Sequence, residues 1–207
     1  MAFGQASMAK DKGEENGDSR LILRVDKDKY LFAIADGMGS GDKANEQSVK
    51  AVNMIESFYK AGFNRDTVIG LTNKLLTFTG GERYNTLDMC IVDLSAGYCD
   101  FIKMGACPAF IKRGENVTVI EGESLPMGAF DEIKPSIIKS KIKENDMIVL
   151  ASDGITDSVG VDELVFLLQK VRTPNPQELA SIIKKRATER GALDDISVIV
   201  GKVYPTK

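Results

Sequence analysis

The feature that most limits the fold is a succession of short apolar runs joined by turn-length connections in the second half of the chain. Six runs are typical of β-strands: 87–94, 98–104, 109–112, 117–120, 136–142 and 147–151. Connections such as 95–97 and 113–116 have the length and composition of hairpin turns. Strands joined in this way pair with their neighbours in antiparallel sheets, so alternating βαβ units are not expected.

Helical periodicity appears in four other segments. A first helix is expected over 44–61 and would end at Gly62. Its buried face would contain Val49, Val52, Ile55, Phe58 and Tyr59. A second would bury Val68, Leu71, Leu75 and Phe78 and close at Gly80-Gly81. Two more are predicted around 164–171 and 179–187, the last with Asn175 as N-cap and Pro176 in its first turn.

A hairpin near the start and a strand near the end complete the pattern. The runs 21–25 and 30–35 flank a charged turn, and a last strand is expected over 196–203. We therefore predict an α+β fold of packed antiparallel β-sheets covered by helices. A chain of 207 residues without repeats or Pro-rich linkers is expected to form one domain over residues 1–207.

Composition excludes several classes of function. A formal net charge of -3 argues against binding to nucleic acid or to an anionic membrane surface. No apolar stretch is long enough to cross a bilayer, and the first residues do not resemble a signal peptide. The 3 cysteines lack metal-type spacing. Reduced thiols and a cytoplasmic location are therefore expected.

The chain contains no histidine. Histidine is the usual general base, the usual partner of serine or cysteine nucleophiles and the commonest zinc ligand. Hydrolase triads, Cys-His enzymes and histidine zinc sites are therefore excluded. Carboxylates remain, and they favour Mg²⁺ and Mn²⁺.

Aspartates stand at the ends of three buried runs. Asp36 and Asp153 each follow an apolar run and precede a glycine, whereas Asp194 and Asp195 come directly before the run 196–200. If this last strand is antiparallel to the other two, the acids meet at one edge of the sheet. Carboxylates gathered at an apolar core repel one another, and divalent cations would remove this conflict.

Three segments resemble the ordered motifs of the PPM family of metal-dependent protein phosphatases: Asp-Gly-Met-Gly-Ser-Gly at 36–41, Ser-Asp-Gly at 152–154 and Asp-Asp-Ile-Ser at 194–197. Within it, the chain is similar to the bacterial sporulation branch, the stage II sporulation protein E phosphatases. Further matches to this branch lie at 15–19, 85–88, 105–110 and 125–128.

The resemblance implies a fold with two antiparallel sheets packed as a sandwich between helix pairs. It implies that Asp36 bridges two cations, Mn²⁺ or Mg²⁺, and that the Gly37 carbonyl binds the first. Asp153 and Asp194 would complete the second. Asp18 matches a position that holds metal-bound water, and Asp195 stands where many relatives have asparagine, so either Asp194 or Asp195 could be the ligand.

The same resemblance implies a biological role. The activity would be hydrolysis of phosphoserine on an anti-sigma factor antagonist by a water or hydroxide held at the two cations, in the control of sporulation. The domain would belong to a longer, membrane-anchored protein with an oligomerising region upstream. A homodimer contact through the helix pair 44–78 is a further hypothesis, in which helix packing sets metal affinity.

Three other interpretations were considered. Cys107 and Arg113 fit the C-x₅-R pattern of cysteine phosphatases, but Phe110 and Ile111 between them are typical of a strand core. The glycines at 37, 39 and 41 could suggest a dinucleotide loop, although the spacing is too short. A non-catalytic interaction module of the same fold is the third, and the presence of every expected carboxylate argues against it.

Overall fold

The computed structural model describes residues 1–11, 13–80 and 84–204. The strands are β1 (Ala2–Met8), β2 (Asp18–Asp26), β3 (Lys29–Gly37), β4 (Asn85–Asp93), β5 (Tyr98–Met104), β6 (Ala109–Arg113), β7 (Asn116–Ile120), β8 (Ser136–Lys141), β9 (Met147–Ala151) and β10 (Ile196–Lys202). The helices are α1 (Asp42–Lys60), α2 (Arg65–Gly80), α3 (Asp153–Val159), α4 (Val161–Lys170) and α5 (Pro176–Glu189).

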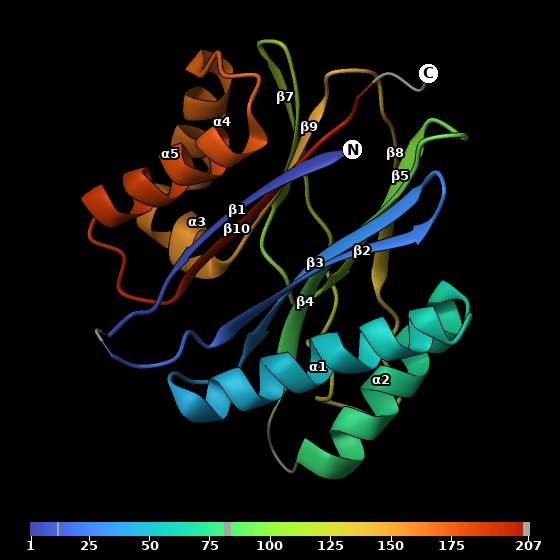
Figure 1. The fold of residues 1–207 in the computed structure, drawn as a ribbon. Helices are drawn as coiled ribbons and strands as arrows, with labels where there is room; N and C mark the ends of the chain where they lie inside the picture. The colour runs from blue at the N-terminus through green and yellow to red at the C-terminus, as the bar shows by residue number, and fades with distance from the viewer. Residues whose placement is uncertain (12, 81–83, 205–207) are drawn as a thin grey trace.

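The strands form two antiparallel sheets, each with five strands among the described residues. Sheet 1 has the order β1-β10-β9-β6-β7, and sheet 2 has the order β2-β3-β4-β5-β8. Helices α1 and α2 cover sheet 2, whereas α3, α4 and α5 lie on the side of sheet 1, so that the sheets are enclosed between two helical layers (Figure 1). This arrangement confirms the predicted α+β sandwich.

Burial on both faces explains why β3 has a continuous apolar sequence. Leu31, Ala33 and Ala35 belong to the core under α1 and α2. Phe32 and Ile34 belong to a second core, between the two sheets. A strand buried on both sides has no polar face, so its sequence does not alternate. A third core fills the space between sheet 1 and its helices.

The predicted strands and helices are all present, and two elements were missed. Strand β1 contains Gly4, Gln5 and Ser7, which weaken any apolar pattern, yet it pairs with β10 along its whole length. Helix α3 has only 7 residues and begins at Asp153, with Ser152 between it and the predicted strand 147–151. Short elements of this kind depend on tertiary contacts more than on local sequence.

The buried faces predicted for the first two helices are partly wrong. Val49 of α1 is 36% exposed, and Phe78 of α2 is 81% exposed. Leu71 and Leu75 of α2 are also exposed. Helix α2 instead turns Asn73 inward, whose amide oxygen accepts from the backbone of Gly128 at 2.8 Å. The buried face of α2 therefore combines Asn73 with Val68, as predicted, and with Ile69 and Leu76.

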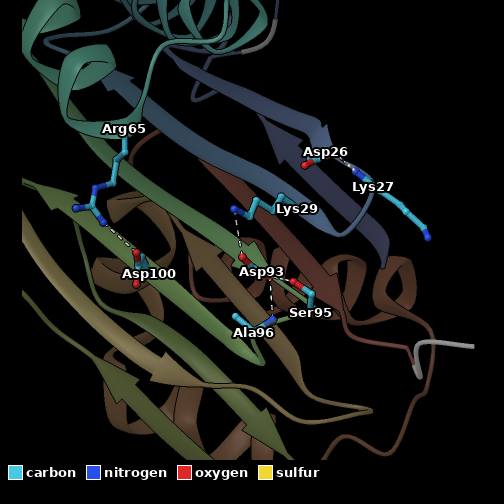
Figure 2. Close-up of polar contacts among 8 residues, drawn as sticks. All are labelled: Asp26, Lys27, Lys29, Arg65, Asp93, Ser95, Ala96 and Asp100. Carbon is cyan, nitrogen blue, oxygen red and sulfur yellow. Dashed lines mark hydrogen bonds and ion pairs between the residues drawn. The ribbon is translucent and has the colours of Figure 1, made fainter.

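Polar contacts fix the end of sheet 2 that is remote from Asp36 (Figure 2). Arg65 at the start of α2 donates to Asp100 of β5 at 2.9 Å. Lys29 of β3 pairs with Asp93 of β4 at 3.3 Å, and Asp93 also accepts from the turn that follows. Such partly exposed pairs contribute little to stability and mainly set register.

No helix in the part of the chain that the structure describes combines the length and the apolar character needed to cross a membrane.

Candidate metal centre

Asp18 and Asp36 face each other across the β2-β3 hairpin. Asp18 begins β2, and its direct partner in the ladder is Asp36, one residue before the end of β3. Asp36 lies on the same side of β3 as Phe32 and Ile34, which belong to the core between the sheets. Both carboxylates therefore face the space between the two sheets, and as like charges directly opposite each other they repel.

The other aspartates come from sheet 1. Asp153 is the first residue of α3 and is separated from β9 only by Ser152, and Asp194 and Asp195 directly precede β10. Because β9 and β10 are antiparallel, the end of one lies beside the start of the other. The expectation of a single sheet edge was wrong: the acids stand at one end of the sandwich and come from both sheets.

Burial and mutual repulsion perturb this group strongly. Burial raises the pKa of Asp36 to about 8, and the negative charges of Asp18 and Asp153 add to the effect. Burial also raises the pKa of Asp18 to about 7, although the hydroxyls of Ser152 and Ser197 partly offset it. The pKa of Asp153 is raised by burial and by the charge of Asp194. These electrostatic couplings place the four carboxyl groups in one neighbourhood.

The donor set fits a hard divalent cation. Both carboxylate oxygens of Asp18 are buried without a hydrogen bond of good geometry. Asp36 and Asp153 line one small cavity together with Ser152. Among the described residues, no three acidic or cysteine side chains stand close enough to enclose an ion as they are. Binding would have to draw the carboxylates together, and oxygen-only donors of this kind suit Mg²⁺ or Mn²⁺.

Asp195 has a different environment from Asp194. Its two carboxylate oxygens accept from the backbone N–H groups of Lys10 at 2.8 Å and Gly17 at 2.7 Å. Among the described residues, Asp194 accepts from the backbone N–H of Asp195 alone, through one oxygen, at 2.9 Å. Asp195 therefore holds the segment that leads into β2, whereas Asp194 keeps an oxygen available for a ligand.

Glycines permit the close packing around these acids. A Cβ on Gly37 would lie 2.1 Å from the carbonyl oxygen of Ala44, in the first turn of α1. A Cβ on Gly154 would lie 2.1 Å from the carbonyl oxygen of Asp195. The glycines of the two Asp-Gly pairs are thus required by backbone contact, and the positive φ values in the loop before α1 belong to Gly39 and Gly41.

A buried ion pair beside the acids was not predicted. Lys103 of β5 is fully buried, and its ammonium donates to Asp88 of β4 at 2.8 Å and to the carbonyl of Cys107. Asp88 lines the same small cavity as Asp36, and its second oxygen has no partner. Burial raises the pKa of Asp88 to about 6 although Lys103 opposes the shift. The only sequence signal was a lysine and an aspartate inside apolar runs.

Cys107 does not have the environment of a nucleophilic cysteine. Burial raises the pKa of its thiol to about 11. The residues that follow form strand β6 rather than a phosphate-binding loop, and the carboxylates of Asp153 and Asp157 add to the rise in its pKa. The geometry therefore argues against a cysteine phosphatase.

Comparison with known proteins places the chain in a family. The family model described as "Stage II sporulation protein E (SpoIIE)" matches residues 26–204. Stage II sporulation protein E of Bacillus subtilis is 32% identical over 98% of this chain, and the match spans 26% of that protein. Phosphoserine phosphatase RsbX of B. subtilis is 24% identical over 90% of this chain and 87% of its own length.

Solved structures agree with this assignment. The PP2C phosphatase domain and regulatory-domain fragment of SpoIIE from B. subtilis superimposes with a TM-score of 0.91 at 28% identity, covering 100% of this chain and 62% of that one. RsbX in complex with magnesium has a TM-score of 0.76 at 19% identity, over 95% of this chain and 92% of that one. The chain therefore belongs to the stage II sporulation protein E family and has the fold of a PP2C-type serine/threonine phosphatase domain.

Proposed function

We propose that this chain is a metal-dependent protein phosphatase that hydrolyses phosphoserine with the help of two Mn²⁺ or Mg²⁺ ions. The observation that carries the proposal is the set of carboxylates that both sheets present at one end of the sandwich. Asp18 and Asp36 have pKa values raised to about 7 and about 8, so the group favours a compensating positive charge. The family and the fold support the same activity.

The residues would divide the work as follows. Asp36 would contact both cations. The Gly37 carbonyl would contact one of them, and Asp153 and Asp194 would contact the other. Asp18, whose two buried oxygens have no hydrogen bond of good geometry among the described residues, would hold water next to the cations. When bound, the cations supply the Lewis acidity that activates water and offsets the charge of the phosphoryl group.

The hydrolysis requires only water as co-substrate. Water oxygen bonds to phosphorus, the bond between phosphorus and the serine oxygen breaks, and a proton from water ends on the serine hydroxyl. The chain has no histidine to carry that proton, so carboxylates and solvent would do so.

Release of phosphate from a phosphoserine protein tests the proposal. We expect activity with Mn²⁺ or Mg²⁺, none in excess chelator, and a loss of about a hundredfold or more in Asp36→Asn. Cys107→Ser should keep its activity and serves as the control. Activity that survives chelator and disappears in Cys107→Ser would mean a cysteine enzyme. A folded protein that binds Mn²⁺ but hydrolyses none of the phosphoproteins tested would support the non-catalytic module.

The natural substrate and assembly are finer proposals. Similarity to the sporulation family supports a phosphorylated anti-sigma factor antagonist, acted on in the cytoplasm by a longer membrane-anchored protein. This chain spans only 26% of the B. subtilis relative, so the role of the whole protein is part of the proposal. A homodimer also remains a proposal. Rates of phosphate release from candidate phosphoproteins, compared with a phosphotyrosine protein, test the substrate class.

A further inference from the structure

Two lysines occupy core-facing positions at the end of sheet 1 opposite the acids. Lys112 of β6 and Lys202 of β10 are both direct ladder partners of Met147 in β9, so the three lie in one row across neighbouring strands. Partners in a row point to the same side of a sheet. On these strands that side carries Phe110, Val149 and Val200, which pack under the helices.

Both ammonium groups are buried without a carboxylate partner. Lys112 is 7% exposed and Lys202 is 6% exposed. The Lys112 ammonium donates to the carbonyl oxygens of Gly114 and Leu168, each at 2.6 Å. The Lys202 ammonium donates to the carbonyl oxygen of Pro174 at 2.9 Å and lies over the ring of Tyr204. Neither lysine belongs to an ion pair within the described part of the chain.

These contacts leave some N–H donors of the two lysines unused and the positive charges of both uncompensated. An ammonium has three N–H donors, so at least one remains on Lys112 and two on Lys202. The Leu168 carbonyl lies in the last turn of α4, where a cation is favoured, and the Pro174 carbonyl lies in the connection between α4 and α5, so both lysines have a structural role. These carbonyls do not neutralise two buried charges, and buried charges in proteins are normally paired.

A third cationic side chain adds to the uncompensated positive charge around this cavity. Arg172, after α4, lines the same cavity. Burial lowers the pKa of Lys112, the charge of Arg172 lowers it further, and the charge of Glu115 opposes these effects. The partner of Arg172 is Glu115, whose side chain is 72% exposed. The cavity measures about 270 Å³, and Asn145 and Thr173 supply further polar groups to its wall.

We propose that this cavity binds a compact oxyanion with two or more negative charges, of the chemical class of phosphate and small phosphomonoesters, through Lys112, Lys202 and Arg172. Several oxygens on one centre can accept from separate donors at once, and a guanidinium matches the geometry of an oxyanion. The site is distinct from the metal centre, because Lys202 ends the strand that Ile196 begins beside the acids.

Anion binding is best measured on the whole chain in chelator, where the metal centre cannot compete. Inorganic phosphate and glycerol phosphate are titrated at constant ionic strength by calorimetry and by melting temperature. We expect saturable binding, weakened by about tenfold, or 1.4 kcal/mol, in Lys202→Met and also in Arg172→Met. Tighter binding of glycerol phosphate than of phosphate would identify phosphomonoesters as the source of the ligand, and the reverse order would identify free phosphate.

The control separates this site from general attraction to a basic surface. Lys170→Met removes the same charge from the last turn of α4, where Lys170 lies over Phe166 outside the cavity wall. Its phosphate affinity should equal that of the unmodified chain. The proposal is overturned if phosphate does not saturate, or if Lys170→Met weakens binding as much as Lys202→Met and Arg172→Met. It is also overturned if Arg172→Met and Lys202→Met keep full affinity while folded.

Discussion

At the scale of single residues, Asp194 and Asp195 show how neighbouring identical side chains can serve different purposes. Each oxygen of the Asp195 carboxylate accepts from one backbone N–H group of the segment before β2. Asn at this position keeps one acceptor oxygen and turns an NH₂ group toward a donor. We expect Asp195→Asn to lower the free energy of unfolding by about 1–3 kcal/mol, measured by denaturant titration in chelator.

Asp194→Asn should behave in the opposite way. Removing one charge from a repelling cluster should leave metal-free stability unchanged or raised, whereas the Mn²⁺ concentration for half-maximal binding should rise by about tenfold or more. If Asp195→Asn weakens Mn²⁺ binding as much as Asp194→Asn does, then Asp195 is itself a ligand.

Asp36 and Asp18 make the metal-free protein sensitive to pH. Their pKa values are raised to about 8 and about 7, against about 4 in an unfolded chain. Between these limits the folded state keeps protons that the unfolded state has lost, so stability falls as pH rises. Below about pH 4 both states are protonated, and above about pH 8 both are ionised, so the dependence ends there.

Melting temperatures in chelator between about pH 5 and about pH 9 measure this effect. Asp36→Asn removes one titrating group and should flatten the decline, whereas the exposed Asp131→Asn should leave it unchanged. An unaltered decline in Asp36→Asn would show that other groups cause the pH dependence.

At the scale of elements, the Asp88–Lys103 pair joins β4 and β5 and also holds the connection to β6. The two residues are ladder partners, and Lys103 additionally binds the Cys107 carbonyl in that connection. Gly105, Ala106 and Cys107 form part of the wall of the small cavity beside Asp36 and Asp153. The pair is therefore placed to position one side of the metal centre.

Lys103→Met would leave Asp88 as a buried carboxyl without its cation. We expect a loss of about 3–5 kcal/mol in the free energy of unfolding, because breaking a buried pair costs more than replacing it. The double change Lys103→Met with Asp88→Leu should recover part of this loss. A single variant as stable as the unmodified chain would show that the pair contributes nothing to the fold.

How far the sequence determined these elements depends on what each side chain does. The run 30–35 identified β3 because both of its faces are buried in apolar cores. The same logic failed for α2, since Asn73 points inward to bind the connection between β7 and β8 while Leu71 is exposed. The burial of Lys103 and Lys112 was not predicted, because their ammonium groups bind partners outside their own strands: Asp88 of β4 for Lys103, and the carbonyls of Gly114 and Leu168 for Lys112. No local pattern records such partners.

For the carboxylates, the sequence indicated the type of site but not its construction. Asp36, Asp153 and Asp194 were identified from their places at strand ends. Their assignment to two sheets requires the strand order, in which β3 belongs to one sheet and β9 and β10 to the other. The hydrogen bonds that Asp195 accepts from Lys10 and Gly17 join residues more than 170 positions apart in the sequence.

At the scale of the whole molecule, the layer between the two sheets is apolar at one end and polar at the other. One end of the inter-sheet layer contains Phe32, Phe101 and Ile148, and the other contains Asp18, Asp36, Ser152 and Ser197. Without cations, repulsion between Asp36 of sheet 2 and Asp153 of sheet 1 acts to separate this end. Divalent cations held by acids from both sheets would reverse the sign of that interaction.

We therefore expect Mn²⁺ to stabilise both sheets together. Mn²⁺ at a hundred times its dissociation constant should add about 2.7 kcal/mol to the free energy of unfolding for each site that it fills. Hydrogen exchange should slow at the start of β2 and the end of β3 in sheet 2, and around Ser152 and Ile196 in sheet 1. The remote end, with the Lys29–Asp93 pair of Figure 2, should change less.

In Asp36→Asn, protection by Mn²⁺ should decrease in sheet 1 as well, although the substitution lies in sheet 2. If sheet 1 keeps its full protection in that variant, the cations do not join the sheets, and Asp153 with Asp194 binds Mn²⁺ independently of Asp36.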